Sequence, residues 1–157
     1  MKNIIVSTEI KLYNIEELNS AEQELINASE NAAKLAYAPY SKFKVGAALL
    51  LSNGAVVNGS NQENASFPVG ICAERVALAN HAMQFPNEKI ESIAIYANNK
   101  ANQPPAAPCG MCRQALYEQE AKQKTPIKLL LKGNGNEIVA VNSVKDLLPL
   151  AFSGEQL

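Results

Sequence analysis

Residues 90–131, IESIAIYANNKANQPPAAPCGMCRQALYEQEAKQKTPIKLLL, set the fold class of this chain. The two ends of this segment, Ile90–Ala97 and Ile127–Leu131, are short apolar runs typical of buried strands. Between them, a loop with three prolines leads into a stretch of helix formers from about Met111 to Lys124. A strand–helix–strand unit places its two strands parallel, with a right-handed crossover. The segment therefore predicts an α/β protein with a partly parallel sheet.

Outward from this segment, the chain offers further strands and helices. Val45–Ser52 and Val56–Ser60 flank an Asn53-Gly54 pair, which predicts a β-hairpin. Ser20, with Gln23 completing a capping box, marks the start of a helix. The other expected elements are a strand over 2–12, the remainder of the first helix to about 36, a helix over about 73–85, a strand over 138–141 and a short last helix capped by Ser143 and Asp146. Strands alternating with helices predict a mixed sheet with helices on its faces, and the Gly-rich turn at 133–136 leaves open an antiparallel last pair.

Length and composition favour one domain over residues 1–157. The chain carries 14 basic and 15 acidic side chains, and this balance argues against a nucleic acid polymer as partner. Its longest apolar runs are too short to cross a membrane. No secretory signal is visible, so we expect a cytoplasmic enzyme whose three cysteines are reduced.

These cysteines occur in two short motifs, Cys72-Ala73-Glu74-Arg75 and Pro108-Cys109-Gly110-Met111-Cys112, each where a loop enters a predicted helix. A helix N-terminus favours the thiolate, which is the form that binds metal. Cys109 and Cys112 are spaced to bind one ion, and Cys72 supplies a third ligand. Three protein ligands with one open position are typical of a catalytic zinc site, whereas structural sites normally have four.

Glu74 follows a ligand by two residues, so it can lie beside the metal without binding it. A carboxylate in that place can move the proton of a metal-activated water. Arg75 is a candidate for offsetting the negative charge of three thiolates by hydrogen bonding to a sulfur. A structural zinc clip, or cysteines that are merely buried, is the competing interpretation. The combination of Cys-x-Glu with Pro-Cys-x-x-Cys is typical of zinc deaminases, and it outweighs that interpretation.

The chain resembles the small homotetrameric zinc-dependent cytidine deaminases from about Ala28 to Phe152. The shared stretches are YAPYSKF (37–43), VGAAL (45–49), NQENASF (61–67), ICAER (71–75), PCGMCRQ (108–114) and LLPLAF (147–152). The resemblance implies a three-layer α/β/α fold with a five-stranded mixed sheet. It also implies a hydrolase of pyrimidine salvage that converts cytidine and 2′-deoxycytidine to uridine and 2′-deoxyuridine with release of ammonia.

The same resemblance implies one zinc ion per chain and a homotetramer with shared active sites. It assigns zinc binding to Cys72, Cys109 and Cys112, proton transfer to Glu74, ribose binding to Asn61 and Glu63, pyrimidine packing to Phe43, and insertion into the neighbouring subunit's site to Phe152. The ribose assignment suits the side chains, because Asn61 can donate and accept hydrogen bonds and Glu63 accepts from a hydroxyl.

The chain departs from the family pattern at two places. Ala107 precedes the Pro-Cys motif where Ser or Thr is usual, and residues 1–20 form an N-terminal extension that we expect either to add an edge strand or to lie across a subunit interface. His81 is interpreted as a packing or surface residue, since the ligand set is complete without it.

Two other functions remain open at this point. One is deamination of a modified nucleoside or a nucleoside antibiotic, although Asn61 and Glu63 favour an ordinary nucleoside. The more remote one is a non-catalytic zinc-stabilised binding module, which would normally have four protein ligands.

Overall fold

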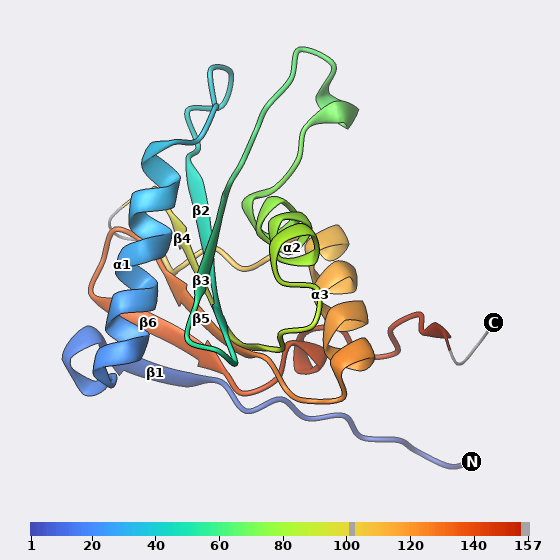
Figure 1. Ribbon diagram of the computed structural model, residues 1–157. Coiled ribbons are helices and arrows are strands. Elements are labelled where there is room, and N and C mark those ends of the chain that lie inside the picture. The colour runs from blue at the N-terminus through green and yellow to red at the C-terminus, as the bar shows by residue number, and fades with distance from the viewer. Residues whose placement is uncertain (101–102, 155–157) are drawn as a thin grey trace.

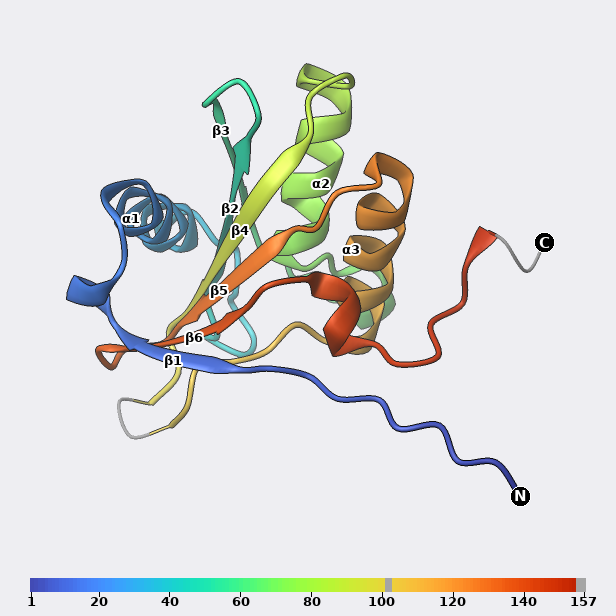
Figure 2. The same ribbon diagram turned by 90° about the horizontal axis from the view of Figure 1, so that it is seen from below.

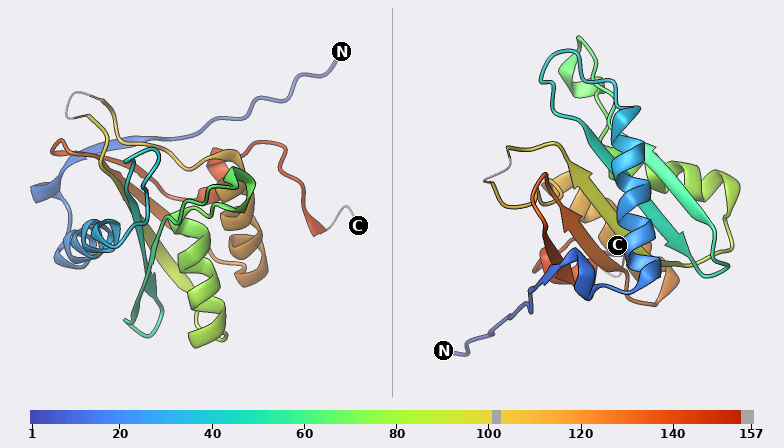
Figure 3. Two further views of the ribbon diagram at one scale, coloured as in Figure 1. Left: turned by 90° about the horizontal axis from the view of Figure 1, so that it is seen from above. Right: turned by 90° about the vertical axis from the view of Figure 1, so that its left-hand side faces the viewer.

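A six-stranded mixed sheet lies between two layers of helices in the computed structural model, which describes residues 1–100 and 103–154 (Figures 1 and 2). The strands are β1 (Lys11–Asn14), β2 (Val45–Leu51), β3 (Val56–Ser60), β4 (Ile90–Ala97), β5 (Lys128–Lys132) and β6 (Glu137–Val141). The helices are α1 (Ser20–Lys34), α2 (Ala73–Gln84) and α3 (Gly110–Gln123), with short 3-10 turns η1 (Ile15–Glu17), η2 (Phe67–Val69) and η3 (Val144–Leu147). Figure 3 shows α1 lying along one face of the sheet, with α2 and α3 on the other.

The strand order is β1-β6-β5-β4-β2-β3, and it confirms the predicted strand–helix–strand unit. Strands β4 and β5 are parallel neighbours, with Ile93 opposite Leu129. The last pair, β5 and β6, is antiparallel, so the Gly-rich turn makes a hairpin. The predicted β2–β3 hairpin is also present, and Gly54 in its turn has a positive φ of 82°, which glycine adopts without strain.

The central strands are apolar on both faces because each face is covered by helices. One core cluster lies under α2 and α3, and a smaller one lies under α1. Successive residues of β5 show the alternation, since Leu129 and Leu131 belong to the first cluster and Leu130 to the second. The expected three-layer α/β/α architecture is therefore confirmed.

The sheet has six strands where the family resemblance predicts five, because part of the N-terminal extension pairs with β6. All four residues of β1 pair in register with residues 137–140 of β6. The strand predicted over 2–12 is wrong for most of its length. Strand β6 has only five residues, so it offers no partner to Ile4 or Val6, whose side chains are exposed.

Two predicted helix starts also need correction. Helix α1 is capped by Asn19, whose side chain accepts a hydrogen bond from the backbone N–H of Glu22 at 2.9 Å, and Glu22 completes the capping box. The box predicted at Ser20 is thus one residue too late. Ser143 makes no side-chain cap, and its hydroxyl instead donates to Glu120 at 2.6 Å. The predicted last helix is only the 3-10 turn η3.

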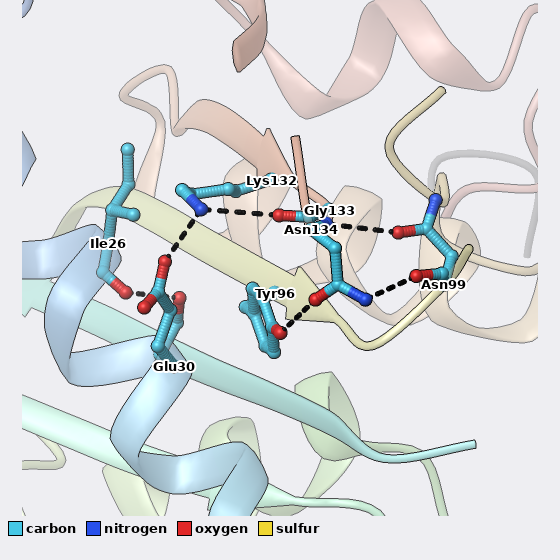
Figure 4. Close-up of polar contacts among 8 residues, drawn as sticks. Ile26, Glu30, Tyr96, Asn99, Lys132, Gly133 and Asn134 are labelled. Carbon is cyan, nitrogen blue, oxygen red and sulfur yellow. Dashed lines mark hydrogen bonds and ion pairs between the residues drawn. The ribbon is translucent and has the colours of Figure 1, made fainter. Parts of the chain in front are cut away.

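A polar cluster joins Asn99, just after β4, to the turn between β5 and β6 (Figure 4). The buried Asn99 donates from its side-chain amide to the carbonyl oxygens of Gln103 and Pro104, at 3.3 and 2.6 Å. The backbone carbonyl oxygen of Asn99 accepts a hydrogen bond from the side-chain amide of Asn134. The oxygen of the same Asn134 side chain accepts a hydrogen bond from the Tyr96 hydroxyl. The β5–β6 turn therefore holds the described part of the proline-rich connection in place.

No helix in the described residues is both long and apolar enough to span a membrane.

Candidate metal centre and active site

The three cysteines are brought together by the N-termini of two helices. Cys72 is the N-cap of α2, Cys109 is the N-cap of α3, and Cys112 lies in the first turn of α3. Helix α2 reaches this position because Gly59 of β3 lets it approach the sheet closely: a Cβ at Gly59 would lie 2.4 Å from the backbone nitrogen of Ala77. The positive ends of both helices therefore point at the sulfurs, which favours thiolates.

The sulfur atoms of Cys72, Cys109 and Cys112 all lie within 4.8 Å of one another. The Sγ atoms of Cys109 and Cys112 are 3.6 Å apart. A tetrahedral zinc ion with Zn–S bonds of about 2.3 Å needs sulfur separations of about 3.8 Å, so the donor set fits zinc. Within the described part of the chain, this is the one cluster of three side chains able to hold a metal. Its burial is uneven, since Cys112 is buried whereas Cys109 is exposed, and this leaves an open side for a water or substrate.

Contacts among the cysteines change the pKa values of their thiols. Hydrogen bonding from Cys112, with smaller contributions from Cys109 and from the charge of Arg75, lowers the pKa of the Cys72 thiol to about 6, although burial and the charge of Glu74 act in the opposite direction. The same contact with Cys72, together with burial, raises the pKa of Cys112. Arg75 acts on the Cys72 sulfur as a nearby charge, and the hydrogen bond from Arg75 to a sulfur that the sequence suggests stays a prediction.

Glu74 lies in the first turn of α2 and is only 4% exposed. Burial raises the pKa of its carboxyl group, while hydrogen bonding with Cys112 acts in the opposite direction. Glu74 thus stands beside the sulfur cluster without being one of its three members. A buried carboxyl group with a raised pKa holds a proton more readily than a free one, which suits a proton carrier.

A cavity of about 590 Å³ opens beside the cysteines, within the usual size range of small-molecule sites. It contains three of the predicted site residues, Cys72, Asn61 and Glu63. The remainder of its lining comes from residues that were not singled out as site residues: Tyr40, Ser41, Gln62, Asn64, Phe67, Gly70, Ile71 and Met111. One member of the metal cluster, Cys72, and the predicted ribose residues therefore line the same cavity.

Asn61 and Glu63 also shape the loop between α1 and β2. Asn61 accepts a hydrogen bond from the backbone N–H of Val45 at 2.8 Å and donates to the carbonyl oxygen of Phe43 at 2.9 Å. Glu63 accepts hydrogen bonds from the backbone N–H of Tyr40 at 2.9 Å, from that of Ser41 at 3.3 Å, and from the Ser41 hydroxyl. The hydroxyl donor has the largest effect among the contacts that lower the pKa of Glu63. Both side chains therefore face the cavity while holding its rim.

The apolar wall of the cavity was missed by sequence reasoning. The rings of Tyr40 and Phe67 pack edge to face with centroids 6.0 Å apart, and Met111 lies between the two cysteines of the α3 motif. All three side chains are exposed, so they are free to contact a bound ring. Tyr40 and Phe67 belong to the stretches that carry the family resemblance, and this was the available signal.

Four other residues discussed from the sequence are not part of the lining of this cavity. Phe43 is partly exposed on the neighbouring loop, held through its backbone by Asn61, and Phe152 is exposed on the C-terminal segment. His81 is buried, and its Nε2 atom lies 2.8 Å from the carbonyl oxygen of Glu88, as expected of a packing residue. Ala107 is exposed just before the buried Pro108.

A larger cavity of about 780 Å³ lies at the C-terminal end of α3. Its lining includes Lys122, Lys124 and Lys145 but none of the three cysteines. The metal-binding chemistry therefore favours the smaller cavity as the active site.

Comparisons with known proteins agree with this site. The model of the cytidine and deoxycytidylate deaminase zinc-binding region matches residues 19–126. A cytidine deaminase of Halalkalibacterium halodurans is 40% identical over 135 residues, which cover 86% of this chain and 96% of the relative. One of Sporosarcina psychrophila is 39% identical over 136 residues, covering 86% and 93%. The crystal structure of cytidine deaminase from Burkholderia pseudomallei matches with a TM-score of 0.73 at 39% identity, covering 82% of this chain and 97% of that one.

Proposed function

The chain belongs to the cytidine deaminase family, and from this premise we propose that it hydrolyses cytidine and 2′-deoxycytidine to the corresponding uridines and ammonia. The observation that carries the proposal is the set of three cysteine sulfurs within 4.8 Å of one another, with Glu74 buried beside them. Cys72, Cys109 and Cys112 hold one zinc ion per chain. Three ligands rather than four favour catalysis over a purely structural metal site.

Bound zinc supplies a Lewis acid that lowers the pKa of water to near 7. Glu74 accepts a proton from the attacking water and delivers it to N3 of the cytosine ring. The water oxygen forms the new bond to C4, and the C4–amino bond breaks. Glu74 then transfers the proton of the new C4 hydroxyl to the amino group, which leaves as ammonia while the C4 carbonyl forms. The raised pKa of Glu74 supports this role, because the group must hold the proton between the two transfers.

The cavity provides what a neutral nucleoside needs. Tyr40, Phe67 and Met111 offer apolar surface for the base, whereas Asn61 and Glu63 offer polar atoms for the sugar hydroxyls. The side-chain amide of Asn61 donates one of its two hydrogens to the carbonyl oxygen of Phe43 and retains the second for a hydrogen bond to substrate. Phe43 packs near the pyrimidine in this proposal, and Arg75 offsets the charge of the thiolates.

The proposal includes assembly into a homotetramer with shared sites. Leu150 and Phe152 on the C-terminal segment are 98% and 59% exposed in the single chain. Apolar side chains so exposed favour a protein interface. In this arrangement Phe152 reaches the cavity of a neighbouring subunit, where Tyr40 and Phe67 are open to receive it.

The test is deamination by zinc-loaded protein across a panel of nucleosides, followed by the absorbance change of the base and by ammonia release. We expect cytidine and 2′-deoxycytidine to be converted, and adenosine, which carries a larger base, to be left unchanged. Conversion of modified cytidines only would instead support the related deaminases. Tight zinc binding without any turnover would support a non-catalytic binding module.

A further inference from the structure

We propose that Arg113 is a positioning residue that fixes the Cys109 loop by tying it to the C-terminal segment. Arg113 directly follows Cys112 in α3 and is half-buried. Its Nε atom donates to the carbonyl oxygen of Pro108 at 2.8 Å, and its Nη1 atom donates to the carbonyl oxygen of Leu147 at 3.0 Å. One planar guanidinium group therefore joins the residue before a zinc ligand to the end of η3.

The two zinc ligands of α3 differ in how firmly they are held. Cys112 is fully buried within the helix, so packing fixes its side chain. Cys109 is exposed and lies at the N-cap, where the backbone leaves the helix. The peptide bond between Pro108 and Cys109 sets the direction in which Cys109 presents its sulfur. A hydrogen bond from Arg113 to the Pro108 carbonyl therefore acts on the ligand that packing holds least.

The contact with Leu147 belongs to a larger docking of residues 143–147 on α3. Arg113, Tyr117 and Glu120 are spaced to share one face of the helix. The Lys145 ammonium lies 5.8 Å from the centre of the Tyr117 ring, and Glu120 accepts from the Val144 N–H at 3.0 Å. Among these three side chains, Arg113 is the one that also hydrogen-bonds to the carbonyl oxygen of Pro108, the residue before Cys109. Movement of the C-terminal segment is thus transmitted to Cys109 through Arg113.

This inference rests on the zinc centre of the proposed function. The test compares Arg113→Ala and Arg113→Lys with two matched variants of the same helix. Gln114→Ala removes a 2.9 Å hydrogen bond to the Phe152 carbonyl, and Glu120→Gln weakens the docking of residues 143–144; neither side chain contacts Pro108 in the described structure. Zinc affinity is measured by competition with a chromophoric chelator, thermal stability by circular dichroism, and local opening by hydrogen exchange.

We expect Arg113→Ala to weaken zinc binding by about 10- to 100-fold, which is typical of losing a group that orients a metal ligand. Hydrogen exchange should rise in peptides covering both 106–112 and 144–148. Arg113→Lys, whose single ammonium cannot reproduce the fork, should recover part of the affinity. Gln114→Ala and Glu120→Gln should keep wild-type zinc affinity, even where Glu120→Gln lowers the melting temperature.

Equal zinc affinity in Arg113→Ala and Gln114→Ala would overturn the positioning role. If Arg113→Ala fails to fold, the test rests on Arg113→Lys. Wild-type zinc affinity in this variant, with unchanged hydrogen exchange in the peptides covering 106–112 and 144–148, would also overturn the positioning role. A wild-type protein that binds no zinc would instead contradict the proposed function, so the two failures are distinguishable.

Discussion

The side chain of Asn61 donates a hydrogen bond to the backbone carbonyl oxygen of Phe43 at 2.9 Å, and so links the lining of the cavity to an aromatic residue beside it. The other end of the same amide accepts from the Val45 N–H at 2.8 Å. Asn61 therefore holds the loop as it enters β2 and fixes the backbone from which the Phe43 ring projects. Asn61, which is assigned to ribose binding, therefore also orients Phe43, which is assigned to packing on the pyrimidine.

Asn61→Asp tests this double role. Aspartate can still accept from Val45, but it cannot donate to Phe43, and its charge faces the Phe43 carbonyl. Losing one hydrogen bond of about 0.5–1.5 kcal/mol should raise KM for cytidine by about 2- to 12-fold. Steady-state kinetics would measure the change, with Asn31→Asp on the exposed side of α1 as the control. Unchanged KM in Asn61→Asp would remove Asn61 from the substrate site.

Glu74→Gln should retain the fold and one zinc per chain, because Glu74 lies beside the three sulfurs rather than among them. The amide cannot carry a proton, so kcat should fall by at least about 10²-fold. Turnover assays combined with elemental analysis would check both parts. Glu91→Gln, an exposed change on β4, is the control and should behave as wild type. Near-normal turnover in Glu74→Gln would reject the proton-transfer role.

Each Cys→Ala change at positions 72, 109 and 112 should abolish tight zinc binding, since a site with three protein ligands has none to spare. Cys112→Ala should also lower thermal stability more than Cys109→Ala, because Cys112 is fully buried and Cys109 is exposed. Elemental analysis and melting curves would separate the two effects. A zinc-free variant with full activity would contradict the metal-dependent mechanism.

The metal centre was predictable because few side chains bind zinc, and their spacing is visible in the chain. The strand–helix–strand unit over residues 90–131 was predictable because buried strands and helix formers follow each other in a short segment. The apolar wall of Tyr40, Phe67 and Met111 was not predictable, because three separate segments form it: the α1–β2 loop, the turn η2 and the first turn of α3. No periodic pattern in the sequence marks these residues as neighbours. The first strand was predicted over residues 2–12, earlier than β1 lies, because the alternation of apolar residues does not set where β1 begins. Its start is set by pairing with β6.

Glu63 provides a test of pH dependence. The Ser41 hydroxyl and the N–H groups of Tyr40 and Ser41 hold the pKa of its carboxyl group below the ordinary value of 4.5. A lowered pKa means that the charged form is favoured in the folded chain, so its stabilising effect is complete above the unfolded pKa and is lost as pH falls through the folded pKa. Glu63→Gln should therefore have a lower melting temperature than wild type at pH 7, with the difference shrinking below pH 4.5.

Melting curves of both proteins from pH 7 down to pH 3 would measure this convergence. Glu91→Gln, whose side chain is exposed on β4, is measured alongside as the control for removing a surface carboxylate. A gap between wild type and Glu63→Gln that stays the same through pH 4.5 would show that the charge of Glu63 does not hold the loop.

The last prediction concerns Phe152 and assembly. Its backbone carbonyl is held by the side chain of Gln114 at 2.9 Å, while its ring remains 59% exposed in the single chain. A ring that completes a neighbour's cavity should contribute about 0.5–1.5 kcal/mol to substrate binding beyond its burial, so Phe152→Ala should raise KM for cytidine by about 2- to 12-fold.

Light scattering should give the mass of four chains for the wild type, in keeping with D₂ symmetry. Leu35→Ala is the control, because it removes another exposed apolar side chain, at the end of α1, and α1 lies on the opposite face of the sheet from α2 and α3 (Figure 2). A wild-type monomer that is fully active at nanomolar concentration would refute shared sites. A tetrameric Phe152→Ala protein with unchanged KM would instead keep the assembly and remove Phe152 from the substrate pocket, because only a ring that contacts the nucleoside changes its affinity.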